Sequence, residues 1–225
     1  RGGSVRGGHG RQSREAAGRV TGPPPARPAA VVWDTVRMDS PASPGAPHPE
    51  TTPPADVVAR LQAALPGRVD VSPTALEAAR ADRSGHRSPA VPLAVVHAAS
   101  VADVQAVCRL AHETRTPLVT RGAGTGLAGG AVAGAGEVVL DVMGMDRILE
   151  VSPADRVAVV EPGILNGALN AALAEHGLWW APDPASKDIS TVGGNIAMNA
   201  GGLLCAKYGV TREAVLGLDV VLADG

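Results

Sequence analysis

Apolar positions recur along this chain at two spacings, one typical of helices and the other of strands. Residues 55–65 and 100–114 repeat apolar side chains at helical spacing, which predicts two amphipathic helices. The short apolar runs 93–97 and 117–120 are typical of buried strands. A strand, a helix and a strand in this order predict a βαβ unit with a parallel pair of strands.

Polar residues at the starts of the predicted helices support this assignment. Ser100 and Asp103 are predicted to form a capping box at the start of the helix 100–114. Residues 72–82 predict a further helix, with Pro73 in its first turn and with Thr74 and Glu77 as its capping box.

The second half of the chain predicts a different kind of sheet. The run 137–142 predicts a strand, and the β-branched runs 147–153 and 156–163 predict a hairpin. A hairpin belongs to an antiparallel or mixed sheet rather than to a doubly wound parallel one. Residues 164–176 predict a helix, and residues 216–225 predict a strand that runs into an Asp-Gly hairpin turn.

The first 54 residues differ in composition from the rest. Ten of the 19 prolines lie within residues 23–54, and residues 1–37 carry seven Arg against only two acidic residues. Such a segment buries too little apolar surface to offset the entropy lost on ordering it. We therefore expect residues 1–54 to be disordered and residues 55–225 to form the folded domain.

We expect neither end of this sequence to coincide with an end of the natural protein. Because the chain lacks an initiating Met, we expect residues 1–37 to be an over-extended, dispensable reading frame and Met38 to be the true start. The Asp224-Gly225 turn calls for a returning strand, and we expect the domain to be truncated at its C-terminus and inactive by itself.

Overall composition excludes several classes of protein. The chain is 45% hydrophobic and 19% charged with a net charge of -2, which fits a soluble globular protein. It has no run of about 18 apolar residues, so we expect no transmembrane segment. The basic N-terminal segment lacks periodicity and aromatic residues, so we expect no nucleic-acid partner. We expect a cytoplasmic location and leave peripheral membrane association open.

Cysteine usage argues against disulfides and metal. Cys108 and Cys205 are the only cysteines, too few for a disulfide framework or a typical zinc site. Cys108 lies on the apolar face of its predicted helix and is interpreted as a packed core thiol.

The densest glycine cluster follows the strand at 117–120. Residues 124–129 spell G-x-G-x-x-G, the fingerprint of a Rossmann unit. A Rossmann unit requires a crossover helix next, and the residues between Gly129 and the strand at 137–142 are too few and too rich in glycine to form one. We expect instead a loop whose backbone amides form an anion nest for a phosphate ester or pyrophosphate, with Gly126 at positive φ. The alternative is a merely flexible surface loop.

A second glycine cluster lies at residues 186–202. Ser190 or Thr191 is expected to cap a short helical turn there and to leave its N-terminal amides free for an anion.

Six motifs occur in an order that resembles a known family. They are PLVTRGAGTGLAGG, EPG, WWAPDPAS, TVGGNIAMNAGG, KYGV and LGLDVVLADG. This series resembles FAD-linked oxidases of the vanillyl-alcohol oxidase type, which carry a PCMH-type FAD-binding domain. Within these it is similar to glycolate oxidase flavoprotein subunits and to D-lactate and D-2-hydroxyglutarate dehydrogenases. The resemblance covers residues 70–225 and implies an α+β fold, with a small α/β subdomain and a β-rich mixed subdomain.

The resemblance also assigns residues to the FAD site. They are Arg121, Gly122, Ala123, Gly124, Thr125, Gly126, Leu127 and Gly130 in the first cluster, then Pro182, Asp183, Gly193, Gly194, Asn195, Asn199, Gly201, Gly202, Tyr208 and Gly209. Some members attach FAD covalently through a histidine of the glycine loop. Thr125 stands at that place here, so the implied FAD is non-covalent.

The implied reaction is oxidation of a small D-2-hydroxy acid to its 2-oxo acid, with FAD supplying the redox chemistry. The electron acceptor, whether a quinone, a cytochrome, an iron-sulfur protein or a flavoprotein, is unknown. The family's substrate-binding and proton-accepting groups lie beyond Gly225, so no catalytic residue is named. The alternatives are an electron-transfer or reductase subunit of the same fold, and an inactive cofactor-binding fragment.

Four further aromatic or histidine residues are interpreted as structural. Trp179-Trp180 is expected to be a packed anchor rather than a flavin-stacking pair. His176 suits the end of a helix, and His97 is interpreted as a satisfied core histidine.

Overall fold

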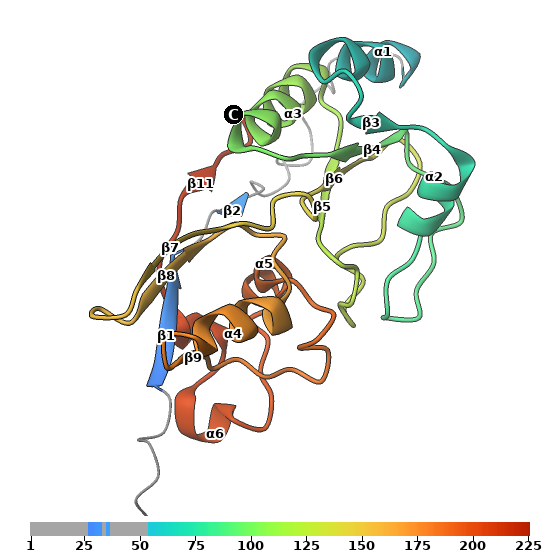
Figure 1. The fold of residues 1–225 in the computed structure, drawn as a ribbon. Coiled ribbons are helices and arrows are strands. Elements are labelled where there is room, and N and C mark those ends of the chain that lie inside the picture. Colours follow the sequence, from blue (N-terminus) through green and yellow to red (C-terminus); the bar gives the residue numbers. More distant parts are fainter. Residues whose placement is uncertain (1–26, 33–34, 37–53) are drawn as a thin grey trace, which may run out of the picture.

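The computed structural model describes residues 27–32, 35–36 and 54–225. These residues form three sheets, of four, five and two strands, and helices pack against the two larger ones (Figure 1). The four-stranded sheet, called the small sheet below, has the order β3-β4-β6-β5. Its strands are β3 (Val69–Asp70), β4 (Ala94–His97), β5 (Leu118–Arg121) and β6 (Val138–Asp141).

Three of these strands run parallel. Strand β6 pairs in parallel with both β4 and β5, whereas β3 is antiparallel to β4. The predicted βαβ unit is present, but its two strands are not neighbours, because β6 lies between them. The chain passes from β5 to the parallel strand β6 through residues 122–137, which contain no helix. This long glycine-rich connection is therefore the crossover itself.

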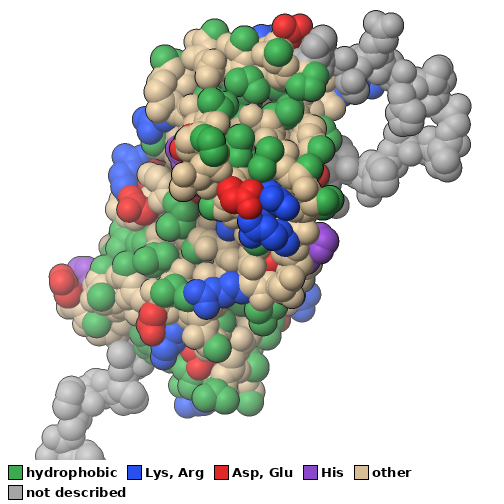
Figure 2. All heavy atoms as spheres, turned by 90° about the vertical axis from the view of Figure 1, so that its right-hand side faces the viewer, with side chains coloured by type: hydrophobic (Ala, Val, Ile, Leu, Met, Phe, Trp, Pro, Cys, Tyr) green, Lys and Arg blue, Asp and Glu red, His purple; other side chains and the backbone are tan. Residues whose placement is uncertain are grey.

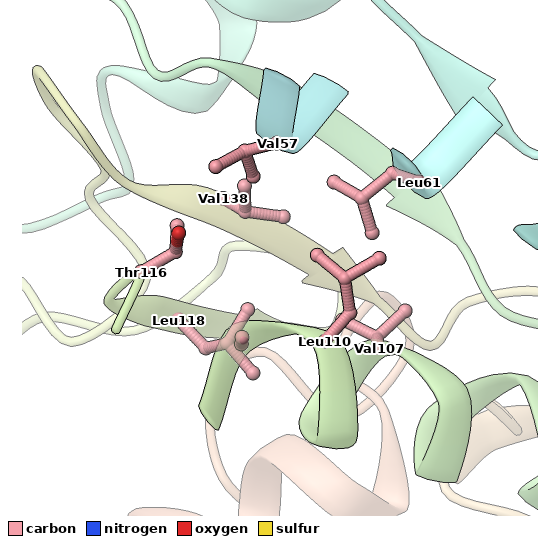
Figure 3. A pocket seen from close by; sticks show the side chains of 8 residues that line it. Val57, Leu61, Val107, Leu110, Thr116, Leu118 and Val138 are labelled. Carbon is pink, nitrogen blue, oxygen red and sulfur yellow. The ribbon is translucent and has the colours of Figure 1, made fainter. Parts of the chain in front are cut away.

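Helices α1 (Pro54–Ala64) and α3 (Val101–Thr114) cover one face of the small sheet. Their apolar faces and the inward side chains of β4 and β6 form the larger core, which includes Cys108 as predicted. A narrow space remains between the two helices and β6, lined by Val57, Leu61, Val107, Leu110, Ala111, Thr116, Leu118 and Val138 (Figure 3). It is too narrow for a water molecule and almost wholly apolar, so it is a packing gap within the core.

The N-termini of α2 and α3 follow the predicted capping only in part. Ser100 caps α3 by accepting a hydrogen bond from the amide of Asp103, but the Asp103 carboxylate accepts from the amide of Ala99 rather than from that of Ser100, so the predicted reciprocal box is not formed. Helix α2 (Pro73–Ala79) covers the other face of the small sheet. Its cap is Ser72, which accepts from the amide of Ala75, so the capping box predicted at Thr74 is wrong. Thr74 lies inside the first turn, because Pro73 already occupies the first helical position.

The second sheet is mixed. The predicted hairpin is present as β7 (Ile148–Ser152) and β8 (Val157–Val160), which pair antiparallel. Strand β1 (Arg27–Val32) lies between β8 and β10 (Val215–Gly217) and pairs in parallel with both. The C-terminal residues form two short strands rather than the single strand expected at 216–223.

Helices α4 (Asn166–Ala174), α5 (Val192–Ala197) and α6 (Cys205–Tyr208) lie in the lower half of the molecule in Figure 1. Strand β9 (Leu178–Trp180), which also pairs with β1, lies there too, and a 3-10 turn follows α6 at Thr211–Ala214. Strands β2 (Thr35–Val36) and β11 (Val220–Val221) pair with each other as the two-stranded sheet, and β11 contacts α3. The second core gathers around Leu169, Leu173 and Trp180.

The N-terminal strands differ from the expectation of disorder up to residue 54. Arg27–Val32 and Thr35–Val36 are paired in sheets. The other residues of that segment, Met38 among them, lie outside the described residues.

The face of the molecule seen in Figure 2 carries charges of both signs side by side, with hydrophobic side chains scattered between them. Among the described residues, Glu77 forms ion pairs with both Arg80 and Arg87. Within the described part of the chain, no helix is both long and apolar enough to cross a bilayer.

Candidate functional site

The glycine loop leaves the small sheet at the carboxyl ends of its parallel strands. There His97, Asp141 and Arg121 are register partners on β4, β6 and β5. Because side chains alternate along a strand, these three project from the same face as Val95 and Val139, which is the face covered by α2. Ligands of open α/β sheets bind beyond this edge.

Within the described structure, no amide from Gly122 to Gly130 donates a hydrogen bond to a protein group. Peptide groups normally find a partner, and a run of free amides on a concave loop is a site for an anion. This observation favours the anion nest over a merely flexible loop.

Two glycines of the loop require the left-handed region, although not the one expected. Gly124 has φ 64° and Gly129 has φ 78°. Gly126 is not at positive φ, and the nearest atom to a Cβ placed there is Asp82 Oδ2 at 3.9 Å. The expectation that Gly126 needs positive φ is therefore wrong, because the turn is made at the glycine before it and at the one after it.

A wall beside the loop was missed by the sequence reasoning. Residues 79–88 run alongside it, with the Arg83 amide bonded to Gly126 O at 3.1 Å and the Ala133 amide bonded to Ala79 O at 3.0 Å. Asp82 Oδ2 in this wall is buried and has no hydrogen-bond partner among the described residues. The only signal in the sequence was the polar turn DRSG between a helix and a strand.

The two glycine clusters meet at one contact. A Cβ on Gly122 would lie 2.4 Å from Oγ1 of Thr191, so the first cluster packs directly on the start of α5. Thr191 caps α5 as predicted by accepting from the Gly194 amide at 3.0 Å.

The N-terminal amides of α5 are not free for an anion, contrary to expectation. The amide of Val192 donates to Ile164 O, and that of Gly193 donates to Pro162 O. The amides of Gly194 and Asn195 both donate to Thr191. Pro162, Ile164 and the cap residue Thr191 thus accept the hydrogen bonds that were expected to remain available for an anion.

Two buried side-chain atoms near α5 remain unpaired among the described residues. They are Oγ of Ser190 and Nδ2 of Asn195, which belong to residues only 2% and 3% exposed. A buried polar group without a partner costs about 1–3 kcal/mol, so such atoms mark a place where a ligand would complete the bonding. The sequence had indicated Ser190 only as one of two residues able to cap α5.

Helix α4 fixes the segment that contains Pro182 and Asp183. Asn170 binds both main-chain groups of Trp180, accepting from its amide at 2.7 Å and donating to its carbonyl at 3.3 Å. Asn166, fully buried, donates to Pro182 O at 3.0 Å. Two asparagine side chains of α4 thus bind the main-chain groups of this segment, as the backbone of a neighbouring strand does in a sheet.

Asp183 in turn holds the segment from Gly201 onward. Its Oδ1 accepts from the amide of Leu204 at 3.0 Å. Its carbonyl lies where a Cβ of Gly202 would be, at 2.0 Å, so only glycine fits at residue 202. Asp183 and Gly202, both in the predicted set, are therefore brought together.

Other predicted residues already have partners within the protein. Asn199 adopts φ 46° and accepts through Oδ1 from the amide of Arg212. Tyr208 meets Trp179 edge to face, with ring centroids 5.0 Å apart, and Lys207 lies over its ring. Trp180 is buried in the second core, in agreement with its interpretation as an anchor.

Two charged pairs lie near the site, one at β4 and β6 and one at the EPG segment. The side chain of His97 is 47% exposed and binds Asp141 Oδ2 through Nδ1 at 2.7 Å, so its interpretation as a core histidine is wrong. At the first residue of the EPG segment, Glu161 accepts hydrogen bonds from the side chain and the amide of Arg147, and these bonds hold the pKa of Glu161 below its usual value. Among the described residues, no three His, Cys, Asp or Glu side chains gather as metal ligands would.

The sequence of this chain matches a known protein family. A family model described as an FAD-binding domain matches residues 92–225. The chain belongs to this family of FAD-binding domains. The match begins at the first parallel strand of the small sheet and includes both glycine clusters.

Curated relatives of this FAD-binding domain are hydroxy-acid enzymes by name. The chain is 44% identical over 134 residues to glycolate oxidase subunit GlcD of Escherichia coli (strain K12), covering 60% of this chain and 27% of that protein. It is 41% identical over 160 residues to a D-2-hydroxyglutarate dehydrogenase of Stutzerimonas stutzeri, covering 71% and 34%. It is 36% identical over 170 residues to a D-lactate dehydrogenase of Anaerostipes hadrus, covering 76% and 36%. The chain thus spans about a third of the length of these relatives.

Solved structures share the fold. An alkyldihydroxyacetonephosphate synthase superposes with a TM-score of 0.64 at 24% identity, covering 73% of this chain and 32% of that one. A p-cresol methylhydroxylase superposes with a TM-score of 0.54 at 26% identity, covering 65% and 29%. The PCMH-type α+β fold expected from the resemblance is confirmed.

The residues present fit FAD. The free amides between Gly122 and Gly130 offer donors to a pyrophosphate, and Gly124 lets the backbone curl there. The unpaired Nδ2 of Asn195 and Oγ of Ser190 offer further polar contacts beside α5.

Proposed function

We propose that this chain supplies the FAD-binding part of a flavoenzyme that oxidises a small D-2-hydroxy acid of the glycolate, D-lactate or D-2-hydroxyglutarate class. The observation that carries the proposal is the run of unpaired amides from Gly122 to Gly130, closed on one side by the start of α5. The substrate class rests on the relatives, whose names are those of glycolate oxidase and of D-lactate and D-2-hydroxyglutarate dehydrogenases.

In this proposal the residues of the two glycine clusters have different tasks. The backbone between Gly122 and Gly130 binds the pyrophosphate, and Asn195 with Ser190 binds polar groups of the cofactor beside α5. Asn166 holds the segment of Asp183 through its bond to Pro182 O, and Asp183 binds the amide of Leu204. Asp183 thereby positions the segment that contains Gly201 and Gly202. FAD, when bound, supplies the redox chemistry, and the chain orients it.

The cofactor is proposed to be non-covalent. Thr125 stands in the loop where the resemblance places a linking histidine in some members, and a threonine hydroxyl does not form that bond. Denaturing the yellow protein with acid should therefore release all of its flavin into the supernatant. Flavin that precipitates with the polypeptide would contradict this.

A competition experiment tests the anion site itself. FAD is titrated into the purified protein and followed by quenching of flavin fluorescence, with ADP and FMN as competitors. Because ADP shares the diphosphate and FMN lacks it, ADP should displace FAD and FMN should not. Displacement by FMN at the same concentration as ADP would contradict the assignment of the glycine loop to the diphosphate.

The reaction is tested by mixing a flavin-loaded enzyme that contains this FAD-binding domain with substrate under anaerobic conditions. D-Lactate, D-2-hydroxyglutarate or glycolate should bleach the flavin absorbance, and the L-enantiomers of the first two should not. Bleaching by none of the acids would favour one of the two alternatives, an electron-transfer or reductase subunit of the same fold or an inactive cofactor-binding fragment. The electron acceptor and a peripheral association with membranes are not assigned.

A further inference from the structure

Arg121 lies at the start of the glycine loop, and its guanidinium folds back against that loop. Nη1 donates to the carbonyl of Ala131 at 2.6 Å, which joins the beginning of the loop to its end. A Cβ on Gly124 would lie 2.3 Å from Nη2, so the guanidinium also packs against the first turn of the loop. One side chain therefore contacts the loop at two places.

Asp82 and Asp141 lie in the neighbourhood of this guanidinium, although neither is among the ion pairs of the described residues with it. Burial lowers the pKa of Arg121, and the charges of Asp82 and Asp141 oppose that effect. Asp82 Oδ1 accepts from the Ser84 amide at 2.8 Å, while Oδ2 is buried, unpaired among the described residues and 3.9 Å from the Cβ position of Gly126. Asp141 is already occupied, since its oxygens accept from the Met143 amide and pair with His97.

This arrangement is unlike that of a phosphate-binding cation. A side chain that neutralises a bound phosphate directs its N–H groups at the ligand. Here the guanidinium is half-buried, bonded to a carbonyl and compensated by two acidic residues of the protein. A carboxylate beside an anion site would weaken anion binding unless it served another purpose.

We propose that Arg121 is a positioning residue, an internal strut that sets the curvature of the glycine loop, and that Asp82 is the counter-charge that keeps this strut in place. Neither side chain contacts the phosphates. The consequence for FAD rests on the proposed function, whereas the strut itself does not.

The sign of one substitution separates this proposal from a simple electrostatic one. Asp82→Asn removes a negative charge beside an anion site. If Arg121 and Asp82 acted only through their charges on the phosphates, this change would tighten FAD binding. If Asp82 holds the strut, the same change loosens the loop and weakens FAD binding.

The strut is tested first without any cofactor, by hydrogen exchange of the unliganded protein. The reporters are the amides of Arg83, Val132 and Ala133, whose hydrogen bonds tie the loop to its wall and to itself. Asp82→Asn and Arg121→Lys should each speed their exchange several-fold and leave the amides of α3 unchanged. Lysine keeps the charge but lacks the planar fork that reaches two places.

Arg83→Gln is the matched control. Arg83 is exposed and adjacent to Asp82, and the substitution alters net charge near the loop without touching its backbone bond to Gly126. It should leave exchange of the loop unchanged. Normal exchange in both Asp82→Asn and Arg121→Lys would overturn the strut.

FAD affinity gives the second readout. The dissociation constant should rise at least several-fold in Asp82→Asn and in Arg121→Lys, and should change little in Arg83→Gln. Tighter binding in Asp82→Asn, or full rescue by lysine at residue 121, would overturn the proposal. If the unsubstituted protein binds no FAD, the proposed function fails, and the exchange experiment alone decides on the strut.

Discussion

Gly122 packs its Cα against the hydroxyl of Thr191, so that a Cβ on residue 122 would lie 2.4 Å from Oγ1. This contact joins the loop after β5 to the cap of α5, and it explains why the first residue of the loop is a glycine. The distance is shorter than any ordinary van der Waals contact, so a larger residue must displace one of the two segments.

Gly122→Ala should therefore destabilise the protein by about 1–3 kcal/mol, the usual range for overpacking. The measurement is thermal or urea unfolding without cofactor. Gly130→Ala is the matched control for the fold, because no atom lies within 4 Å of a Cβ at Gly130 and its φ is not positive. That control should unfold at the same temperature as the parent protein.

A double-mutant cycle assigns the loss to the contact itself. Thr191→Ala removes Oγ1 and the cap of α5, which alone costs about 0.5–2 kcal/mol. In the double variant the methyl group introduced at residue 122 no longer meets a hydroxyl, so the combined loss should be smaller than the sum of the two separate losses. Strict additivity would show that the contact is not the cause.

Asn170 should matter for stability more than its position on a helix suggests. Asn170→Ala raises intrinsic helix propensity, yet it leaves the amide and carbonyl of Trp180 without their partner. We expect a net loss of about 1–3 kcal/mol, because main-chain groups lose their hydrogen bonds in a partly buried setting. Unfolding in urea checks this, and a stabilised variant would show that solvent replaces both bonds.

Local patterns were sufficient to predict most elements. The helices at α1 and α3, the hairpin of β7 and β8 and the glycine connection without a helix all follow from periodicity, caps and turn residues. The error at α2 was also local, since Ser72 and Thr74 are both capable of capping and only the backbone decides between them.

Long-range pairing was not predictable in the same way. The sequence could not show that Pro162 and Ile164 take up the first amides of α5, nor that residues 79–88 line the glycine loop. These contacts join segments far apart in the chain, and no local periodicity records them. The resemblance supplied the site as a list of residues, and the structure separates those with free polar groups from those, such as Asn199, already bonded within the fold.

Acid should destabilise the protein in part through Glu161. Its side chain is 7% exposed and bonded to Arg147, and these bonds lower its pKa from 4.5. A carboxylate with a lowered folded-state pKa stabilises the fold above its unfolded pKa, and this contribution is lost as the pH falls through the folded value. As the pH drops below about 4.5, the melting temperature should therefore decrease, and this decrease should be smaller in Glu161→Gln.

Arg147→Gln provides the complementary test of the same pair. It leaves a buried carboxylate without its main partner, so the pKa of Glu161 should rise and the acid-induced loss should begin at a higher pH. Melting curves of the three proteins across the acid range distinguish these cases. Identical pH profiles would show that the pair contributes nothing to the pH dependence.

Removal of the N-terminal strand β1 should destabilise the protein. This prediction is opposite to the expectation from the sequence that residues 1–37 are dispensable. Strand β1 pairs with β9 through Arg27–Ala29, with β8 through Ala30–Val32 and with β10 at its end. A chain that begins at residue 38 would lack these pairings and expose the edges of three strands, which favours association with other chains. It should melt several degrees lower and aggregate sooner than a chain that begins at residue 27, which keeps β1 and β2. Equal melting temperatures, with equal hydrogen exchange in β8, would show that the sheet does not depend on β1.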